Sequence, residues 1–198
     1  METEKLLFIN ACIRGRELSR TYRLCKIFLN EYNKARPGAT LEEVDLTSEK
    51  ILCYDLETIN RRDSLIDSGK FQDEMFSHAK QFARANKIVI GAPYWDLSFP
   101  AALKAYVEHV SVRNITFRNV LDGVAGMCLA EKLIYITTAG GYIDGADYGT
   151  EYFRGLCKFF GIKHFEKIRA EGLDIESNDS NAIMAATEKD TILASKRF

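Results

Sequence analysis

Short apolar runs alternate with amphipathic stretches along the whole chain, and no other feature constrains the fold as strongly. The apolar runs, each of which predicts a strand, are residues 5–10, 39–46, 87–92, 132–138 and 164–172. A strand, a helix and a second strand in succession form a parallel pair, because the helix returns the chain to the edge where the first strand began. We therefore expect a parallel sheet with helices on both faces.

Apolar residues spaced three or four positions apart indicate the helices between these runs. The strongest stripe consists of Phe99, Ala102, Leu103, Tyr106, Val107 and Val110. Other stripes predict helices that begin near Tyr22, Phe71 and Tyr148 and a last helix over residues 179–195. Two stretches lack a clear period: residues 47–70 predict a long excursion with at most one helical turn, and residues 111–131 predict a loop.

Five strands joined by right-handed crossovers leave few possible arrangements. We expect the flavodoxin-like order 2-1-3-4-5, in a three-layer α/β sandwich with helices on both faces of the sheet. The 198 residues contain no internal repeat and no interdomain linker, so we expect a single domain over residues 1–198. Ligands bind such sheets beyond the carboxyl ends of the strands, near the point where the strand order reverses.

Charge and composition exclude several classes of function. The net charge of −1 gives no general attraction to nucleic acid or to an anionic membrane. No apolar run approaches the ~20 residues of a membrane helix, and the first residues, METEKLLFINAC, lack the pattern of a signal peptide. The five cysteines form no C-x-x-C pair, which favours reduced thiols in a cytoplasmic protein and argues against a metal site.

Three loops lie at the predicted binding edge, and the first of them carries a phosphate-binding signal. Residues 11–21 contain three arginines and place Ser19 and Thr21 at a helix start. Helix N-termini bind phosphate because their first N–H groups are free and carry partial positive charge. The alternative is an ordinary capped helix with solvated arginines. Neither a Walker motif nor G-x-G-x-x-G is present, which disfavours a dinucleotide held in the Rossmann manner.

The other two loops are suited to a flat ring. Residues 93–97 have the sequence PYWDL and include Trp95, the only tryptophan of the chain. An aromatic wall beside backbone amides suits a planar heterocycle, although these aromatics could instead pack under the next helix. Gly140 and Gly141 directly follow a strand and would allow close approach of a ligand, with a plain turn as the alternative. A phosphate site and a flat wall together fit flavin mononucleotide (FMN).

The sequence resembles the FMN-dependent NADH azoreductases and NAD(P)H quinone oxidoreductases of the flavodoxin-like fold. The resemblance covers nearly the whole chain and is weakest over residues 47–70. It rests on SRT at 19–21, APYWDLSFPAALKAY at 92–106, ITFR at 115–118, TTAGG at 137–141 and AEG at 170–172. The second of these motifs is the most specific, whereas the glycine pair is weak by itself.

The resemblance implies particular flavin contacts, residue by residue. Ser19 and Thr21 would contact the phosphate. The flavin ring would be lined by Pro93, Tyr94, Trp95, Asp96 and Leu97. The opposite part of the ring would be reached by Thr138, Ala139, Gly140 and Gly141.

The resemblance also implies a homodimer with two active sites at the subunit interface, and NADH or NADPH as co-substrate. The reduced flavin would pass two electrons to a quinone, an azo compound or a similar small-molecule acceptor in a ping-pong cycle. Because the flavin supplies the chemistry, no side chain is required as a catalytic acid or base. We expect the three histidines, His78, His109 and His164, to be structural or solvated.

Asp96 departs from the family pattern, which usually has asparagine at this place. A carboxylate close to the flavin would oppose negative charge on its reduced form and lower its potential. The alternative is that Asp96 faces solvent or caps the following helix. Two further functions stay open at this point: a flavodoxin-type electron-transfer protein without NAD(P)H turnover, and a flavin-free protein on the same fold. The nearly neutral charge and the length favour the enzyme.

Overall fold

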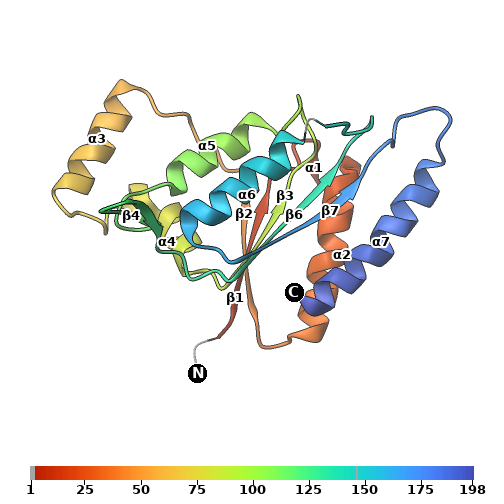
Figure 1. Ribbon diagram of the computed structural model, residues 1–198, viewed down its shortest axis with the longest axis horizontal. Coiled ribbons are helices and arrows are strands. Elements are labelled where there is room, and N and C mark those ends of the chain that lie inside the picture. The colour runs from red at the N-terminus through yellow and green to blue at the C-terminus, as the bar shows by residue number, and fades with distance from the viewer. Residues whose placement is uncertain (1–2, 146) are drawn as a thin grey trace.

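A five-stranded parallel sheet forms the centre of the molecule in the computed structural model, which describes residues 3–145 and 147–198 (Figure 1). Its strands are β1 (Lys5–Asn10), β2 (Thr40–Asp45), β3 (Lys87–Gly91), β6 (Lys132–Thr138) and β7 (His164–Ala170). The spatial order is β2-β1-β3-β6-β7, and every neighbouring pair is parallel. Counted along the chain, this is the predicted order 2-1-3-4-5.

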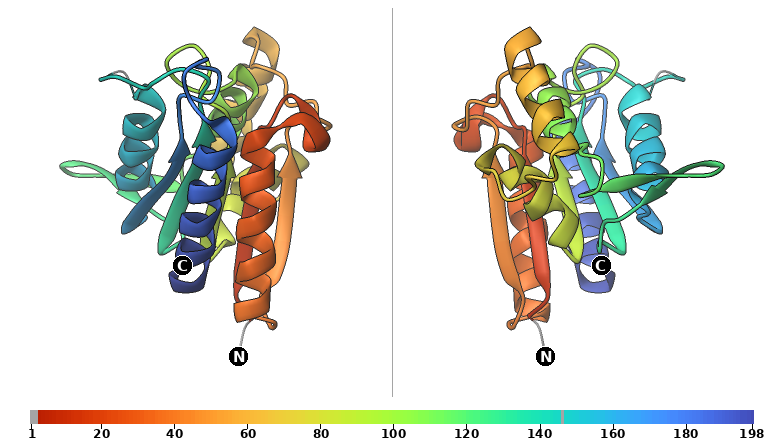
Figure 2. Two further views of the ribbon diagram at one scale, coloured as in Figure 1. Left: turned by 90° about the vertical axis from the view of Figure 1, so that its right-hand side faces the viewer. Right: turned by 90° about the vertical axis from the view of Figure 1, so that its left-hand side faces the viewer.

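Helices cover both faces of the sheet, so the predicted three layers are confirmed (Figure 2). One face carries α2 (Arg20–Ala35) and α7 (Ser180–Arg197), which pack against each other. The other face carries α4 (Ser77–Arg84), α5 (Ala101–Val110) and α6 (Tyr148–Phe160). The helix predicted to begin near Phe71 starts as a 3₁₀ turn, η1 (Glu74–Phe76), and continues as α4.

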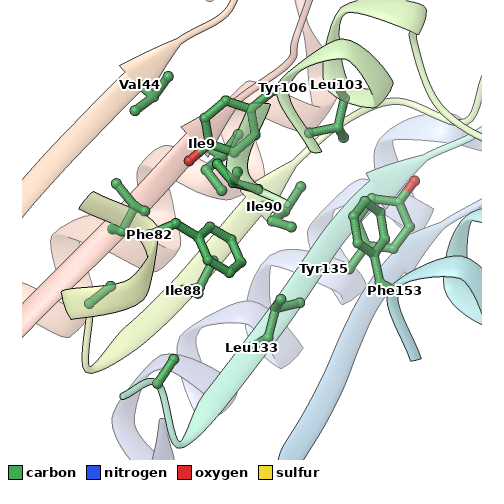
Figure 3. Close-up of a cluster of buried hydrophobic side chains, with 14 of the residues drawn as sticks. Ile9, Val44, Phe82, Ile88, Ile90, Leu103, Tyr106, Leu133, Tyr135 and Phe153 are labelled. Atoms are coloured by element: carbon green, nitrogen blue, oxygen red, sulfur yellow. The ribbon is translucent and has the colours of Figure 1, made fainter. Parts of the chain in front are cut away.

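The alternation of side chains along each strand divides the core into two halves. Leu7 and Ile9 of β1 join the cluster beneath α4, α5 and α6, which Figure 3 shows in close-up. Leu6 and Phe8 point to the opposite face and join the cluster beneath α2 and α7. Because both faces are covered, four successive positions of the strand, residues 6–9, are apolar instead of every second one. Each such side chain contributes about 1.5–3 kcal/mol to stability by leaving water.

The segment 47–70 contains a three-turn helix, α3 (Leu56–Asp67), so the prediction of at most one helical turn is wrong. Only Ile66 of this helix is buried, and therefore no apolar stripe marks it in the sequence. Its start is stabilised by a capping box, in which the Asp55 side chain accepts from the Thr58 N–H at 2.8 Å and the Thr58 hydroxyl accepts from the Asp55 N–H at 2.9 Å. This local signal was present in the sequence.

The segment 111–131 contains a two-stranded antiparallel ribbon instead of the predicted loop. Its strands are β4 (Phe117–Val120) and β5 (Gly123–Gly126). The ribbon projects from the body of the molecule (Figure 2), and Leu121 at its tip is 99% exposed. At its base Phe117 packs against Phe159 of α6, with ring centroids 4.5 Å apart. Because most residues of the ribbon are exposed, its strands lack the alternation of apolar and polar residues that indicates a half-buried strand.

The first loop contains a four-residue helix, α1 (Gly15–Leu18), where the sequence predicted no regular structure. Among the described residues, no helix is long and apolar enough to cross a membrane.

Gly126 fixes the base of the ribbon against α6. A β-carbon at this position would lie 2.0 Å from the Phe160 carbonyl carbon and 2.1 Å from the Gly161 nitrogen. We predict that Gly126→Ala lowers the free energy of unfolding by about 1–3 kcal/mol, because backbone must shift to admit the methyl group. Urea denaturation measures this change.

The matched control is Gly155→Ala in α6, where an added β-carbon meets open space. That variant should gain about 0.5–1 kcal/mol, the usual difference between alanine and glycine inside a helix. Equal stability of Gly126→Ala and the parent protein would contradict the close packing of the ribbon base.

Candidate functional site

The three loops singled out from the sequence converge on one cleft at the carboxyl ends of β1, β3 and β6. The cleft has a volume of about 190 Å³. It is lined by Arg14, Leu18, Ser19, Arg20, Thr21, Pro93, Tyr94, Trp95, Thr138, Gly140 and Asp174. Seven of the eleven residues predicted to hold a flavin are among them, whereas Asp96, Leu97, Ala139 and Gly141 are not part of this lining.

The N-terminus of α2 forms one end of the cleft. Ser19 is buried, and its hydroxyl oxygen accepts from the Tyr22 N–H at 3.1 Å, which makes it the N-cap of the helix. A hydroxyl carries one proton in addition to its acceptor sites, so the Ser19 proton remains for a ligand. The first N–H groups of the helix add further donors and a partial positive charge at this end.

Two buried threonines connect α2 to the end of β6. The Thr21 and Thr138 hydroxyl oxygens lie 2.7 Å apart, and one of them donates to the other. One proton is used in this bond, so the second hydroxyl proton remains available in the cleft. The bond also joins the first and third predicted loops, which are separated by more than a hundred residues of sequence.

The arginines of the first loop separate into two groups. Arg14 and Arg20 line the cleft. Arg16 instead donates to Glu43 and Asp45 of β2, at 2.9 Å in both cases. The bond to Asp45 raises the pKa of the Arg16 guanidinium above its usual range. The basic character of this end of the cleft therefore comes from two of the three arginines.

The aromatic loop is a tight turn. The Trp95 N–H donates to the Ser98 carbonyl at 3.1 Å, and the Ser98 N–H donates to the Trp95 carbonyl at 2.9 Å. Asp96 and Leu97 between them have φ angles of 47° and 67°, the combination found in type I′ turns. Leucine rarely adopts positive φ, so the turn stores strain at the edge of the cleft.

This turn presents side chains outward instead of burying them. Trp95 is 41% exposed, so it is not buried beneath α5 as the alternative interpretation of the aromatics required, and Leu97 is 52% exposed. Asp96 is exposed as well. Tyr94 is half-buried, and its N–H donates to the Thr138 carbonyl at 2.9 Å, which fixes the start of the turn to β6.

The glycine pair of the third loop has one member with a packing requirement. A β-carbon on Gly140 would lie 2.2 Å from a carboxylate oxygen of Asp174, whereas Gly141 meets open space. Ala139 is buried, and its N–H donates to the Ala170 carbonyl at 2.8 Å, which extends the pairing of β6 with β7. Gly140 thus makes room for a neighbouring side chain of the protein itself.

Asp174 and Leu18 line the cleft but were not predicted. Asp174 follows β7 by four residues, at the same edge of the sheet as the three loops. The rule that selected the loops after the first, third and fourth strands also applies to the loop after the fifth. Leu18 belongs to α1, whose four residues are too few for a periodic signal.

Comparison with known proteins agrees with this geometry. A family model described as flavodoxin-like fold matches residues 4–191. The FMN-dependent NADH:quinone oxidoreductase 2 of Clostridium perfringens is 34% identical over 195 residues, which cover 97% of this chain and 98% of that protein. The enzyme of the same name from Clostridium acetobutylicum is 35% identical over 199 residues, covering 98% and 99%. The chain belongs to this flavodoxin-like family.

Solved structures show the same fold. An azoreductase from Bacillus anthracis superimposes with a TM-score of 0.89 at 24% identity, covering 98% of this chain and all of that one. The azoreductase AzrA gives a TM-score of 0.86 at 25% identity with the same coverage. The family assignment rests on the sequence relatives, and the superpositions confirm the three-layer architecture.

Proposed function

We propose that this protein is an FMN-dependent NAD(P)H oxidoreductase that reduces quinones, azo compounds or similar two-electron acceptors. One observation carries the proposal: a helix N-terminus with free hydroxyl protons lies across a narrow cleft from an exposed aromatic turn. FMN has a phosphate at one end and a flat ring at the other, and this arrangement offers a site for each. The relatives of about 35% identity are named FMN-dependent NADH:quinone oxidoreductase 2, which supports the quinone part of this activity.

The residues of the cleft fit FMN at both ends. Ser19 and Thr21 supply hydroxyl groups beside the N-terminus of α2, which suits the phosphate. Pro93, Tyr94 and Trp95 form the opposite wall, which suits the flavin ring. The proposed flavin-binding set also includes four neighbouring residues of the second and third loops, namely Asp96, Leu97, Ala139 and Gly141. We also propose that residues 1–198 form a single domain.

The protein contributes binding and orientation, and no side chain is assigned as a catalytic acid or base. FMN, when bound, supplies the hydride chemistry. The aromatic turn would line one side of a bound flavin ring, and NADH or NADPH and the acceptor would occupy the other side in turn. Such orientation of two reactants accounts for much of the rate enhancement in reactions of this type.

The decisive experiment is a visible absorption spectrum of the purified protein before and after NADH is added. We predict a noncovalent flavin that bleaches with NADH and recovers when menadione is supplied. The alternative, a flavodoxin-type electron-transfer protein, predicts bound flavin without NADH turnover. A colourless protein that takes up no FMN would contradict the proposal.

The phosphate end of the site can be tested by removing its hydroxyl groups. We predict that replacing Ser19 and Thr21 together with alanine weakens FMN binding by about 1–3 kcal/mol, the size of hydrogen bonds to a charged group. Quenching of flavin fluorescence measures the affinity. The control exchanges the two residue types, Ser19→Thr with Thr21→Ser, which keeps both hydroxyl groups and should keep most of the affinity. Unchanged affinity in the alanine variant would contradict this placement.

We further propose that the protein is a cytoplasmic homodimer. Small-molecule sites usually enclose about 300–1,000 Å³, which exceeds the roughly 190 Å³ of this cleft, so a second subunit could complete it. Several large apolar side chains are exposed, among them Leu97 in the aromatic turn, Leu121 at the ribbon tip, Tyr142 and Tyr148. All five cysteines are free thiols, which agrees with a reducing compartment.

Light scattering tests the assembly. The chain mass is 22.5 kDa, and we predict about twice that value at micromolar concentration. Leu121→Glu should shift the protein toward monomer, because a charge at the exposed ribbon tip would oppose burial in an interface. The control is Leu193→Glu on α7, where a leucine is 59% exposed on the other face of the sheet. A monomeric parent protein would refute the proposed dimer.

A further inference from the structure

An ion pair lies at the phosphate end of the cleft. The Arg20 guanidinium donates to a carboxylate oxygen of Asp174 at 2.7 Å and to the Leu173 carbonyl at 3.1 Å. Arg20 is the first residue of α2, whereas Asp174 lies in the segment after β7, more than 150 residues later. Both residues line the cleft. The pair therefore joins the N-terminus of α2 to the edge of the sheet across the cleft.

The carboxylate in this pair has a defined position. The Asp174 N–H donates to the Gly140 carbonyl at 2.8 Å, and the Leu173 N–H donates to the Ala139 carbonyl at 3.2 Å. These bonds hold the segment after β7 against the third loop. The Asp174 side chain lies directly over Gly140, in the space that a β-carbon there would occupy.

Arg20 retains donors for a ligand after making these contacts. A guanidinium has five N–H groups in a rigid planar fork, and two of them are used by Leu173 and Asp174. Three N–H groups remain, and such a fork matches the geometry of phosphate. Arg16 on the same loop is not part of the cleft lining, because its guanidinium is held by Glu43 and Asp45 of β2.

We propose that Arg20 makes the site select phosphorylated flavin over riboflavin, and that Asp174 is a positioning residue that acts through Arg20. This inference rests on the proposed FMN-dependent function. A free arginine side chain populates many rotamers, and ordering them on binding costs affinity. The two contacts from the segment after β7 hold the guanidinium in place beforehand, which reduces that cost.

The charge of Asp174 gives the proposal a sharp test, because two effects of this carboxylate have opposite signs. A negative charge at the phosphate end repels the phosphate, so removing it would tighten FMN binding if repulsion dominated. Loss of the contact that holds Arg20 would instead weaken FMN binding. The proposal requires the second effect to be the larger one.

The experiment measures dissociation constants of FMN and riboflavin for the flavin-free protein by fluorescence quenching. We expect Arg20→Gln to weaken FMN binding tenfold or more and to change riboflavin binding less than twofold. Asp174→Asn should weaken FMN binding at least threefold, again with little effect on riboflavin. In the double variant FMN should bind no more weakly than in Arg20→Gln, because the positioning effect of Asp174 is exerted through Arg20 and only the repulsion remains to be removed.

Matched variants accompany these substitutions. Arg16→Gln makes the identical change on an arginine bound outside the cleft and should alter FMN affinity less than twofold. Gly140→Ala places a methyl group where the Asp174 carboxylate lies, and it should weaken FMN binding as Asp174→Asn does. Gly155→Ala in α6 adds the same methyl group in open space outside the cleft lining and should not.

Each outcome decides between the possibilities. An equal loss of FMN and riboflavin affinity in Arg20→Gln would overturn the role of Arg20 in reading the phosphate. Tighter FMN binding by Asp174→Asn, or additive effects in the double variant, would overturn the positioning role of Asp174. A parent protein that binds neither flavin would overturn the proposed function itself, together with this assignment.

Discussion

Burial of the central sheet on both faces is the constraint on which the rest of the structure depends. Leu6 and Phe8 enter one core cluster, and Leu7 and Ile9 enter the other, so a single strand supports both layers of helices. Buried backbone groups must find partners, and within the sheet they find them on neighbouring strands. Backbone groups without a strand partner remain at the strand ends as well as along the outer sides of β2 and β7. The site forms at the carboxyl ends of the strands.

The cleft is a consequence of how the strand ends are joined. The Thr21–Thr138 hydroxyl pair and the bond from the Tyr94 N–H to the Thr138 carbonyl bring three loops to the end of β6. The Arg20–Asp174 pair adds a fourth segment from β7. An exposed ion pair contributes little to stability, so the value of this pair lies in its position at the phosphate end of the cleft.

The accuracy of sequence-based prediction followed burial. Strands β1 and β6 were predicted at their observed bounds and helix α6 at its observed start, because buried elements carry continuous or periodic apolar patterns. Helix α3 buries only Ile66, and the ribbon strands β4 and β5 lie mostly in solvent, so both escaped a search based on apolar period. The Asp55–Thr58 capping box was the one local signal that could have revealed α3.

The sequence by itself determined the fold class, the strand order and the three loops of the site, because these follow from local apolar pattern and from the handedness of strand crossovers. Only the tertiary structure decided which side chains of those loops meet. The Arg16 side chain is bound to Asp45 of β2, whereas Arg20 pairs with Asp174 in the cleft, although both arginines belong to one short loop. The tertiary structure also showed that Gly140 accommodates Asp174. Such pairings depend on contacts between residues far apart in sequence, and no local pattern encodes them.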